Sequence, residues 1–327
     1  MYNAYIISLN NPIKLLTKIS EYNLNSILVE GVNGSKLTNS EINQNTTLLC
    51  SIFCPKSVVG IAMSHTKAWK EFIKSKEKIA LFFEDDAVFV DNFRTKLDTA
   101  IKNTPDDFDI LYLGCFGCDN PINFFTLINS GIINLNASKI NKYVKKPEIA
   151  FALHGYILSR KGAIKLINII KKNINYHLDY KLQYLIKNNQ INAYSLNKRI
   201  VYQTSTDDTM STNNNNTHPM IITNILSNYY LDTKVKASYM ANVTFMRIGD
   251  LNLSLFSIIF LISGIVLSTI EINIYKITGI YLLVSSPDIY MNPKNKMIII
   301  HYLLLIVPYL LIKYFDLWSY ITVKSGK

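Results

Sequence analysis

The 327-residue sequence lacks several features that would assign it to a common class of protein. Its first residues do not combine a basic segment with a long apolar core, so we expect no signal peptide. The formal net charge is +11, but the lysines are spread among asparagines and form no dense basic block. The sequence therefore argues against nucleic-acid binding, and an anionic membrane surface or phosphorylated ligands explain the charge better.

Cysteine is also scarce. The four cysteines occur as a C-x3-C pair, Cys50 and Cys54, and a C-x2-C pair, Cys115 and Cys118. Zinc sites use such spacings, but no further metal-site pattern flanks either pair. We therefore predict free thiols in a reducing compartment.

The stretch from Lys78 to Phe89 is the most informative part of the sequence. A short apolar run over residues 79–83 ends in three acids, Glu84, Asp85 and Asp86, and its length predicts a buried strand. On an extended backbone, Glu84 and Asp86 would project to one face and Asp85 to the other. Adjacent carboxylates repel one another unless a positive charge lies between them, so they suit a divalent metal. A solvated acidic turn is the alternative.

The N-terminal part alternates strands with helices. We expect strands over residues 4–9 and 26–30 around a helix over 13–22, which is typical of a parallel α/β unit. Residues 35–56 are polar and are predicted to form a loop region. Further helices are expected over 58–73, 93–101, 163–171 and 176–187, and further strands over 79–83, 109–113 and 150–159.

The chain becomes far more apolar from residue 251 onward. An uncharged run of 18 residues covers 253–270, and one of 16 residues covers 297–312 and continues into aromatic residues. Helices of this length can span a membrane, so we predict transmembrane helices over 251–271 and 297–317 that form a hairpin. Core helices of a soluble domain are the alternative.

Three sequence blocks in fixed order carry a family resemblance. The block over 60–70 (GxxxSHxxxWK) precedes the acidic triplet, and a second block covers 109–114 (DILYLG). A third covers 154–163 (HGYILSRKGA) and is followed by Asp179. Together they resemble glycosyltransferase family 25, which includes bacterial lipooligosaccharide galactosyltransferases and collagen hydroxylysine galactosyltransferases. The resemblance covers roughly residues 1–215.

The resemblance implies a GT-A type nucleotide-diphosphosugar transferase fold and an inverting transfer, often of galactose from UDP-galactose. It also implies dependence on Mn²⁺ (or Mg²⁺), with Glu84, Asp85 and Asp86 as the equivalent of the family's DxD metal motif. Such an ion acts as a Lewis acid on the departing diphosphate. The sequence departs from the family at residues 10–14 (NNPIK), where members usually carry an arginine soon after the first strand.

An inverting displacement also needs a base that takes the proton of the acceptor hydroxyl. Asp179 is the first candidate for this base, and Asp207 and Asp208 are the second. Alternatively, Asp179 stabilises the start of its helix. Expected contacts of the donor or the metal are Ser64, His65, His154 and Arg160, with packing of the histidines and solvation of Arg160 as alternatives.

These patterns predict a membrane-anchored transferase, as in lipopolysaccharide biosynthesis, with a catalytic domain over 1–215, a linker over 216–250 and a membrane-associated tail over 251–327. The catalytic domain is expected to face the cytosol, because no signal peptide is expected before it. The acceptor would be a glycan, a lipid-linked sugar or a protein hydroxyl. Two alternatives stay open: an inactive membrane scaffold that binds a nucleotide sugar, and a metal-dependent phosphate hydrolase.

Overall fold

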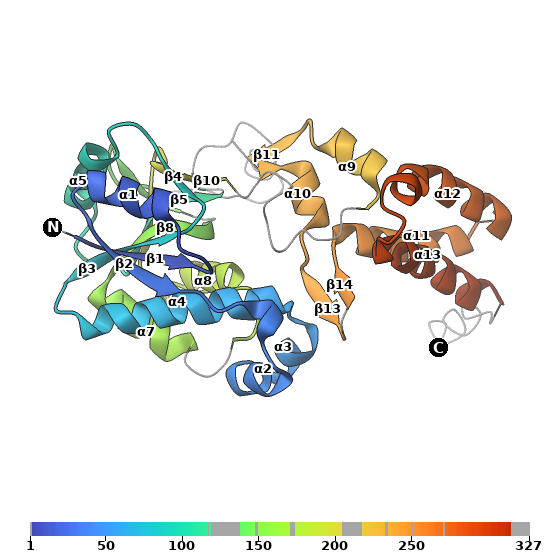
Figure 1. Cartoon of the computed structure of the whole chain (residues 1–327), viewed down its shortest axis with the longest axis horizontal. Helices are drawn as coiled ribbons and strands as arrows, with labels where there is room; N and C mark the ends of the chain where they lie inside the picture. The colour runs from blue at the N-terminus through green and yellow to red at the C-terminus, as the bar shows by residue number, and fades with distance from the viewer. Residues whose placement is uncertain are drawn as a thin grey trace. The chain divides into compact units, whose positions relative to one another are not determined.

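The chain folds into two units in a computed structural model, which describes residues 2–116, 118, 138–147, 150–170, 174–204, 218–232, 235–249, 251–270 and 272–314. The N-terminal unit comprises residues 1–205 and Leu231–Thr233, and the C-terminal unit comprises Thr206–Tyr230 and Lys234–Lys327. The N-terminal unit holds a mixed sheet with helices on both faces (Figure 1).

The N-terminal unit is built on a mixed sheet whose eight described strands follow the order β2-β1-β3-β8-β5-β9-β7-β6. β1 runs parallel to β2 and β3, which confirms the predicted parallel start, whereas β8 runs antiparallel between β3 and β5. The first residues of β8 therefore lie beside the last residues of β3 and β5. The strand bounds are β1 Asn3–Ser8, β2 Asn25–Glu30, β3 Ile79–Glu84, β5 Ile110–Phe116, β6 Ser138–Lys139, β7 Val144–Lys146, β8 Phe151–Ser159 and β9 Ala193–Leu196.

Helices cover both faces of this sheet, which explains why β1 and β3 are apolar at almost every position. Alternate strand residues point to opposite faces, so Tyr5 and Phe82 enter one core cluster while Ile6 and Phe83 enter the other. The first cluster packs under α4 (Lys56–Lys74), α7 (Arg160–Ile170) and α8 (Leu178–Lys187). The second packs under α1 (Ile13–Glu21) and α5 (Phe93–Asn103), on the other side of the sheet in Figure 1.

Residues 35–56 form helices, so the loop prediction for this region is wrong. A 3-10 turn η1 (Gly34–Lys36) precedes α2 (Asn39–Asn45) and α3 (Leu48–Phe53). Thr38 and Glu41 form a capping box at α2, and Thr47 caps α3, so polar side chains stabilise both helices. Each helix buries little apolar surface, which hid it from a search for periodic apolar residues.

The prediction of free thiols is also wrong. The structure joins Cys50 to Cys54, and Cys115 to Cys118, in disulfides. The last turn of α3 brings the Cα atoms of Cys50 and Cys54 to 4.6 Å, and the end of β5 brings those of Cys115 and Cys118 to 5.5 Å. Both separations lie in the range that disulfides bridge.

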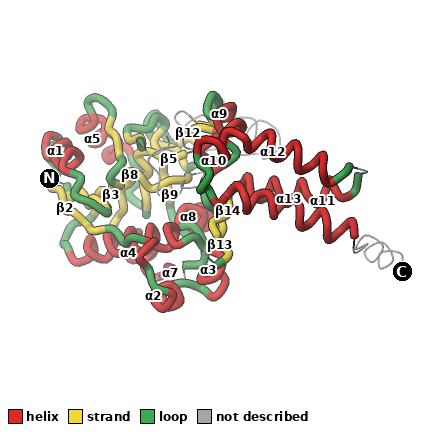
Figure 2. Tube along the Cα trace, turned by 45° about the vertical axis from the view of Figure 1, so that its right-hand side comes forward, coloured by secondary structure: helices red, strands yellow, loops and turns green. Residues whose placement is uncertain are grey.

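The C-terminal unit is mainly helical, and the stretch predicted as a linker, 216–250, contains helices of its own. Figure 2 shows α11 and α13 side by side. Gly264 of α11 permits this contact, because an added Cβ would lie 2.1 Å from the carbonyl oxygen of Leu305. The elements of this unit are α9 Met220–Leu226, β12 Val235–Lys236, α10 Ala237–Asn242, β13 Met246–Ile248, β14 Leu251–Leu253, α11 Leu255–Ser268, α12 Ile274–Met291 and α13 Lys296–Tyr314. The short strand β11 (Tyr230–Asp232) falls on the boundary, since its last two residues belong to the N-terminal unit.

Of the two predicted spans, only the second corresponds to a described helix long and apolar enough to cross a membrane. This helix is α13, with 19 residues, and a core helix of a soluble protein passes the same criterion. α11 has only 14 residues, below the ~17–25 that a span needs. This helix is shorter than the predicted span over 251–271 at both ends. Residues 251–253 form the strand β14, and a turn follows Ser268.

A small polar cluster is buried among these helices. The Nδ1 atoms of His218 and His301 lie 2.7 Å apart. Their Nε2 atoms contact Ser285 Oγ at 3.1 Å and Ser257 Oγ at 2.9 Å, respectively. All four residues are at most 1% exposed. The hydrogen bonds compensate for burying these polar groups.

Candidate active site

Some of the predicted site residues, among them the acidic triplet and His65, gather where β1 and β3 end and β8 begins. β3 ends at Glu84, and the backbone turns at Asp85 and Asp86 before β4 (Ala87–Phe89). The triplet is therefore not extended, and the alternation of faces considered from the sequence does not apply to it. β4 pairs with β10 (Val201–Gln203), and Thr204 N donates to the carbonyl of Asp86 at 3.1 Å.

The acids of the triplet have different surroundings. Glu84 is 29% exposed at the side chain, and its Oε1 lies 3.0 Å from Nε2 of the buried His65. Asp85 is exposed and accepts a hydrogen bond from Ser8 Oγ at 2.5 Å. Asp86 is half-buried. The sequence blocks predicted that the SH pair and the acidic triplet share a site, and the structure brings His65 and Glu84 together.

A hydrogen-bonded chain fixes the orientation of His65. Trp69 Nε1 donates to the hydroxyl oxygen of Tyr156 at 2.8 Å, and this hydroxyl lies 2.8 Å from His65 Nδ1. Because the indole N–H can only donate, the Tyr156 hydroxyl gives its own proton to His65 Nδ1. His65 then carries its proton on Nε2 and donates to Glu84. Burial lowers the pKa of His65 to about 4, which agrees with a neutral ring.

Asp179 joins this group from the first turn of α8. Its Oδ2 accepts a hydrogen bond from Ala152 N in β8 at 3.1 Å. Burial, followed by the charge of Glu84, raises the pKa of Asp179 to about 6. Burial, followed by the charge of Asp85, raises the pKa of Glu84 to about 7. Carboxyl groups with raised pKa values are typical of sites that transfer protons near neutral pH.

Tyr112 of β5 contributes a buried hydroxyl group to the same electrostatic environment. Its hydroxyl is buried and forms no hydrogen bond within the described part of the chain. The pKa of Tyr112 is raised by burial and by the charge of Asp179, which places the two residues in one electrostatic environment. A buried hydroxyl without a partner costs free energy, and a ligand hydroxyl or a water would satisfy it.

Ser64, His154 and Arg160 were also predicted to contact the donor or the metal, and the structure shows each of them bound to backbone groups. Ser64 Oγ accepts from Val32 N and donates to Gly60 O, both at 2.7 Å, which fixes α4 against the preceding loop. His154 is buried beside Val201, whose carbonyl lies 3.3 Å from His154 Nε2.

Arg160 lies at the far end of β8 from Asp179. Its guanidinium donates to the carbonyls of Ile73 and Ser75 at the end of α4. The structure thus gives Arg160 the role of a helix cap and does not bring it to the cluster. Asp207 and Asp208, the second candidates for the base, lie outside the described residues.

Sequence reasoning did not assign roles to Tyr156, Trp69, Tyr112 or Ser8. Trp69 and Tyr156 stand within the first and third blocks, but 87 residues separate them, so only the fold reveals their hydrogen bond. Ser8 could have been predicted as a site residue from the sequence. It is a polar residue at the end of a central strand, and the carboxyl ends of parallel strands meet at one edge of the sheet.

The acidic triplet has the oxygen ligands that Mg²⁺ and Mn²⁺ prefer. Within the described residues, no three His, Cys, Asp or Glu side chains already form a cluster able to hold a metal. Mg²⁺ commonly binds through one or two carboxylates and completes its coordination with waters and substrate phosphates. The exposed Asp85 and the half-buried Asp86 are adjacent carboxylates of one turn and fit this second pattern.

Comparisons with known proteins concern the N-terminal part of the chain. The family model of glycosyltransferase family 25, described as an LPS biosynthesis protein, matches residues 1–182, which include the acidic triplet and Asp179. Over 157 residues the chain is 27% identical to a mimivirus protein named procollagen lysyl hydroxylase and glycosyltransferase, from Acanthamoeba polyphaga mimivirus. The match covers 44% of this chain and 16% of that protein. The chain belongs to glycosyltransferase family 25.

Proposed function

We propose that the chain is a metal-dependent inverting hexosyltransferase that moves galactose from UDP-galactose to a hydroxyl group of an acceptor. Membership of the family supports glycosyl transfer. The observation that carries the metal-dependent and inverting parts of the proposal is the arrangement of oriented carboxyls: His65 and Ser8 bind Glu84 and Asp85, and Ala152 N binds Asp179. We also propose that the sheet of the N-terminal unit is of the GT-A type.

In this proposal Asp179 is the general base. The hydrogen bond from Ala152 N holds Oδ2 and thereby orients the carboxylate. A pKa of about 6 leaves Asp179 ionised at neutral pH and makes it a stronger base than an ordinary aspartate. It would accept the proton of the acceptor hydroxyl as that oxygen attacks the anomeric carbon of the donor.

The acidic triplet would hold Mn²⁺ or Mg²⁺. The ion would stabilise the negative charge that develops on the diphosphate as the sugar leaves. Ser8 holds Asp85 by its hydroxyl, and His65 holds Glu84, so residues from β1 and α4 orient two of the three acids. These contacts support a role for the triplet beyond that of a solvated turn.

We further propose that α13 attaches the protein to a membrane and that the N-terminal unit faces the cytosol. The length and composition of α13 support the attachment. A lipid-linked glycan, as in lipopolysaccharide biosynthesis, would then be an acceptor within reach, and a protein hydroxyl is the other acceptor class in the family.

A donor screen tests the enzymatic proposal. Purified full-length protein is incubated with common UDP- and GDP-sugars, with Mn²⁺, with Mg²⁺ or with a chelator, and nucleotide release is measured. We expect release from UDP-galactose with either metal and none with the chelator, and Asp86→Asn should abolish it. Turnover by Asp86→Asn equal to that of the wild type would refute the metal assignment. No release from any donor would favour the inactive sugar-binding scaffold, to which the absent arginine at residues 10–14 points.

A further inference from the structure

A row of exposed aromatic side chains lies beside Asp179. Tyr180 and Tyr184 are one turn apart on the same side of α8, and Tyr176, just before the helix, lies against Tyr180. Their exposed fractions are 38%, 52% and 57%, and the rings of Tyr176 and Tyr180 are 5.4 Å apart. The ring of Phe151 lies 5.0 Å from that of Tyr180. These four residues are called the α8 aromatic row below.

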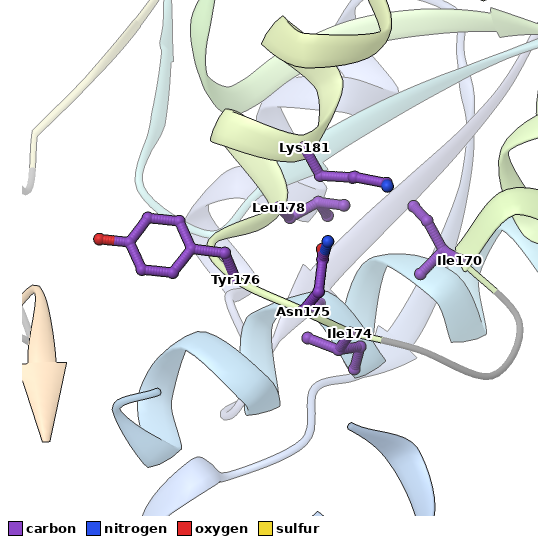
Figure 3. Close-up of a pocket in the computed structure, with 7 residues that line it drawn as sticks. Ile170, Ile174, Asn175, Tyr176, Leu178 and Lys181 are labelled. Atoms are coloured by element: carbon purple, nitrogen blue, oxygen red, sulfur yellow. The ribbon is translucent and has the colours of Figure 1, made fainter. Parts of the chain in front are cut away.

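The row borders an open hollow. Its lining consists of Asn175, Lys181 and the three tyrosines, and its volume of about 320 Å³ lies at the lower end of the ~300–1,000 Å³ that small-molecule sites occupy. Figure 3 shows the ring of Tyr176 directed away from the apolar side chains of Ile174 and Leu178. The smaller cavity beside them holds about 10 Å³, room for about one water.

The α8 aromatic row and Asp179 both belong to contacts between α8 and the start of β8. Tyr180 follows Asp179 directly in α8, and Phe151 directly precedes Ala152, whose N–H binds the Asp179 carboxylate. The contact between the Phe151 and Tyr180 rings joins these segments a second time. The side chains of the consecutive residues Asp179 and Tyr180 leave α8 about 100° apart, and Asp179 does not line the hollow. The row therefore lies on the side of α8 that adjoins the side of the proposed base.

The chemistry of the hollow matches a sugar ring. One face of a pyranose carries C–H groups that pack on aromatic rings, while its hydroxyl groups need hydrogen-bond partners. The tyrosine hydroxyls, the Asn175 amide and the Lys181 ammonium offer such partners around the apolar faces. A surface that only contacts another protein has no need to lie beside a general base.

We propose that the α8 aromatic row is part of the acceptor subsite, on which one pyranose ring of a glycan acceptor stacks while a neighbouring sugar of the same glycan reaches Asp179. This inference rests on the proposed transferase function and selects a glycan over a protein hydroxyl as the acceptor.

Sugar binding without donor tests this inference separately from turnover. Saturation-transfer NMR is recorded on the full-length protein in detergent with lactose and with methyl β-galactopyranoside. We expect the ring protons to receive saturation in the wild type and Tyr180→Ala to weaken binding by about tenfold, the upper end for one aromatic contact. Tyr180→Phe should retain binding. Tyr143→Ala removes a tyrosine that is 40% exposed elsewhere in the same unit and should change nothing.

Several results would overturn the inference. These are the absence of binding of both sugars, equal binding by the wild type and a Tyr176→Ala/Tyr180→Ala variant, or a loss of self-association in Tyr180→Ala with unchanged sugar signals. Turnover measured on the same samples separates the two proposals. If the protein turns over donor but sugar binding does not depend on the row, only this inference is refuted. If sugar binding depends on the row but no donor is turned over, the transferase proposal is refuted and the row is a glycan-binding surface.

Discussion

At the scale of single residues, the site depends on hydrogen bonds that have one allowed direction. The indole N–H of Trp69 fixes the hydroxyl of Tyr156, which fixes the tautomer of His65, which in turn holds Glu84. Three buried aromatic or imidazole rings therefore determine how one carboxylate is presented at the end of β3. Tyr112, on the neighbouring strand β5, has a hydroxyl that takes part in no such chain among the described residues.

Two tyrosine substitutions compare the hydrogen-bonded hydroxyl of Tyr156 with the hydroxyl of Tyr112. Tyr156→Phe leaves the Trp69 N–H and His65 Nδ1 without their partner, so we expect it to lower the free energy of unfolding by about 1–3 kcal/mol. Tyr112→Phe removes a hydroxyl that forms no hydrogen bond within the described chain and should change stability by about 0.5 kcal/mol or less. Urea unfolding of both variants measures the difference. Equal losses of unfolding free energy would contradict the hydrogen bonds that link Trp69, Tyr156 and His65.

The raised pKa of Asp179 predicts how stability depends on pH. The folded state binds this proton more tightly than the unfolded state, with a pKa of about 6 against 3.8. Between pH 3.8 and 6 the folded protein therefore loses stability as the pH rises, and the deficit persists at neutral pH. Asp179→Asn removes this deficit and retains an acceptor for the Ala152 N–H.

We expect Asp179→Asn to gain stability relative to the wild type as the pH rises from 4 to 7.5, while its transfer rate falls about 10²-fold or more. Melting temperatures at a series of pH values and initial rates of nucleotide release measure these effects. Asp179→Ala serves as the control, since it also loses the acceptor of the Ala152 hydrogen bond. A stability difference that does not change with pH would contradict the raised pKa.

At the scale of elements, apolar patterns predicted most strands and helices of the N-terminal unit, because long elements bury a continuous face. α2 and α3 escaped prediction because their capping residues, Thr38 and Thr47, contribute more than any apolar stripe. The disulfide of Cys50 depends on the end of α3 and was missed together with that helix.

The candidate site was predicted in pieces. The blocks that contain His65, Glu84 and Asp179 are separate in sequence, and family resemblance placed them together before the structure did. The position of β8 between β3 and β5 has no local signature, since strand order depends on pairings between distant residues. For the same reason, the capping role of Arg160 could not be read from its place at the start of a helix.

Two glycines of the C-terminal unit predict opposite effects of the same substitution. Gly264→Ala places a methyl group against the backbone of α13 at Leu305, so we expect a loss of about 1–3 kcal/mol or more. Gly279 lies inside α12 with open space around its Cα, and alanine there should stabilise the helix by about 0.5–1 kcal/mol. Thermal unfolding in detergent compares the two variants, and a tolerated Gly264→Ala would contradict the close packing of α11 and α13.

At the scale of the whole molecule, the proposed attachment to a membrane rests on α13, the one described helix that is long and apolar enough to span. Leu303, in the middle of α13, is 50% exposed within the chain. A lysine at the centre of a spanning helix costs about 2.5–3.5 kcal/mol, so Leu303→Lys should shift the protein from the membrane pellet into the carbonate-soluble fraction. Leu48→Lys, at an exposed position of α3, is the matched control and should stay in the pellet. Wild-type protein in the soluble fraction would refute the anchor.

The position of β8 also has a consequence for the order in which the protein folds during synthesis. β3 and β5 are complete once residue 116 has been made, yet in the native sheet they do not pair with each other. Each has an edge that waits for residues 151–159. Nascent chains between these lengths therefore expose one edge of β3 and both edges of β5, since β9 is also not yet made, and unpaired apolar strand edges promote aggregation. The strand that brings Tyr156 to His65 is thus also the one that joins β3 to β5, whereas Asp179 and β9 follow later in the chain and complete the site and the sheet.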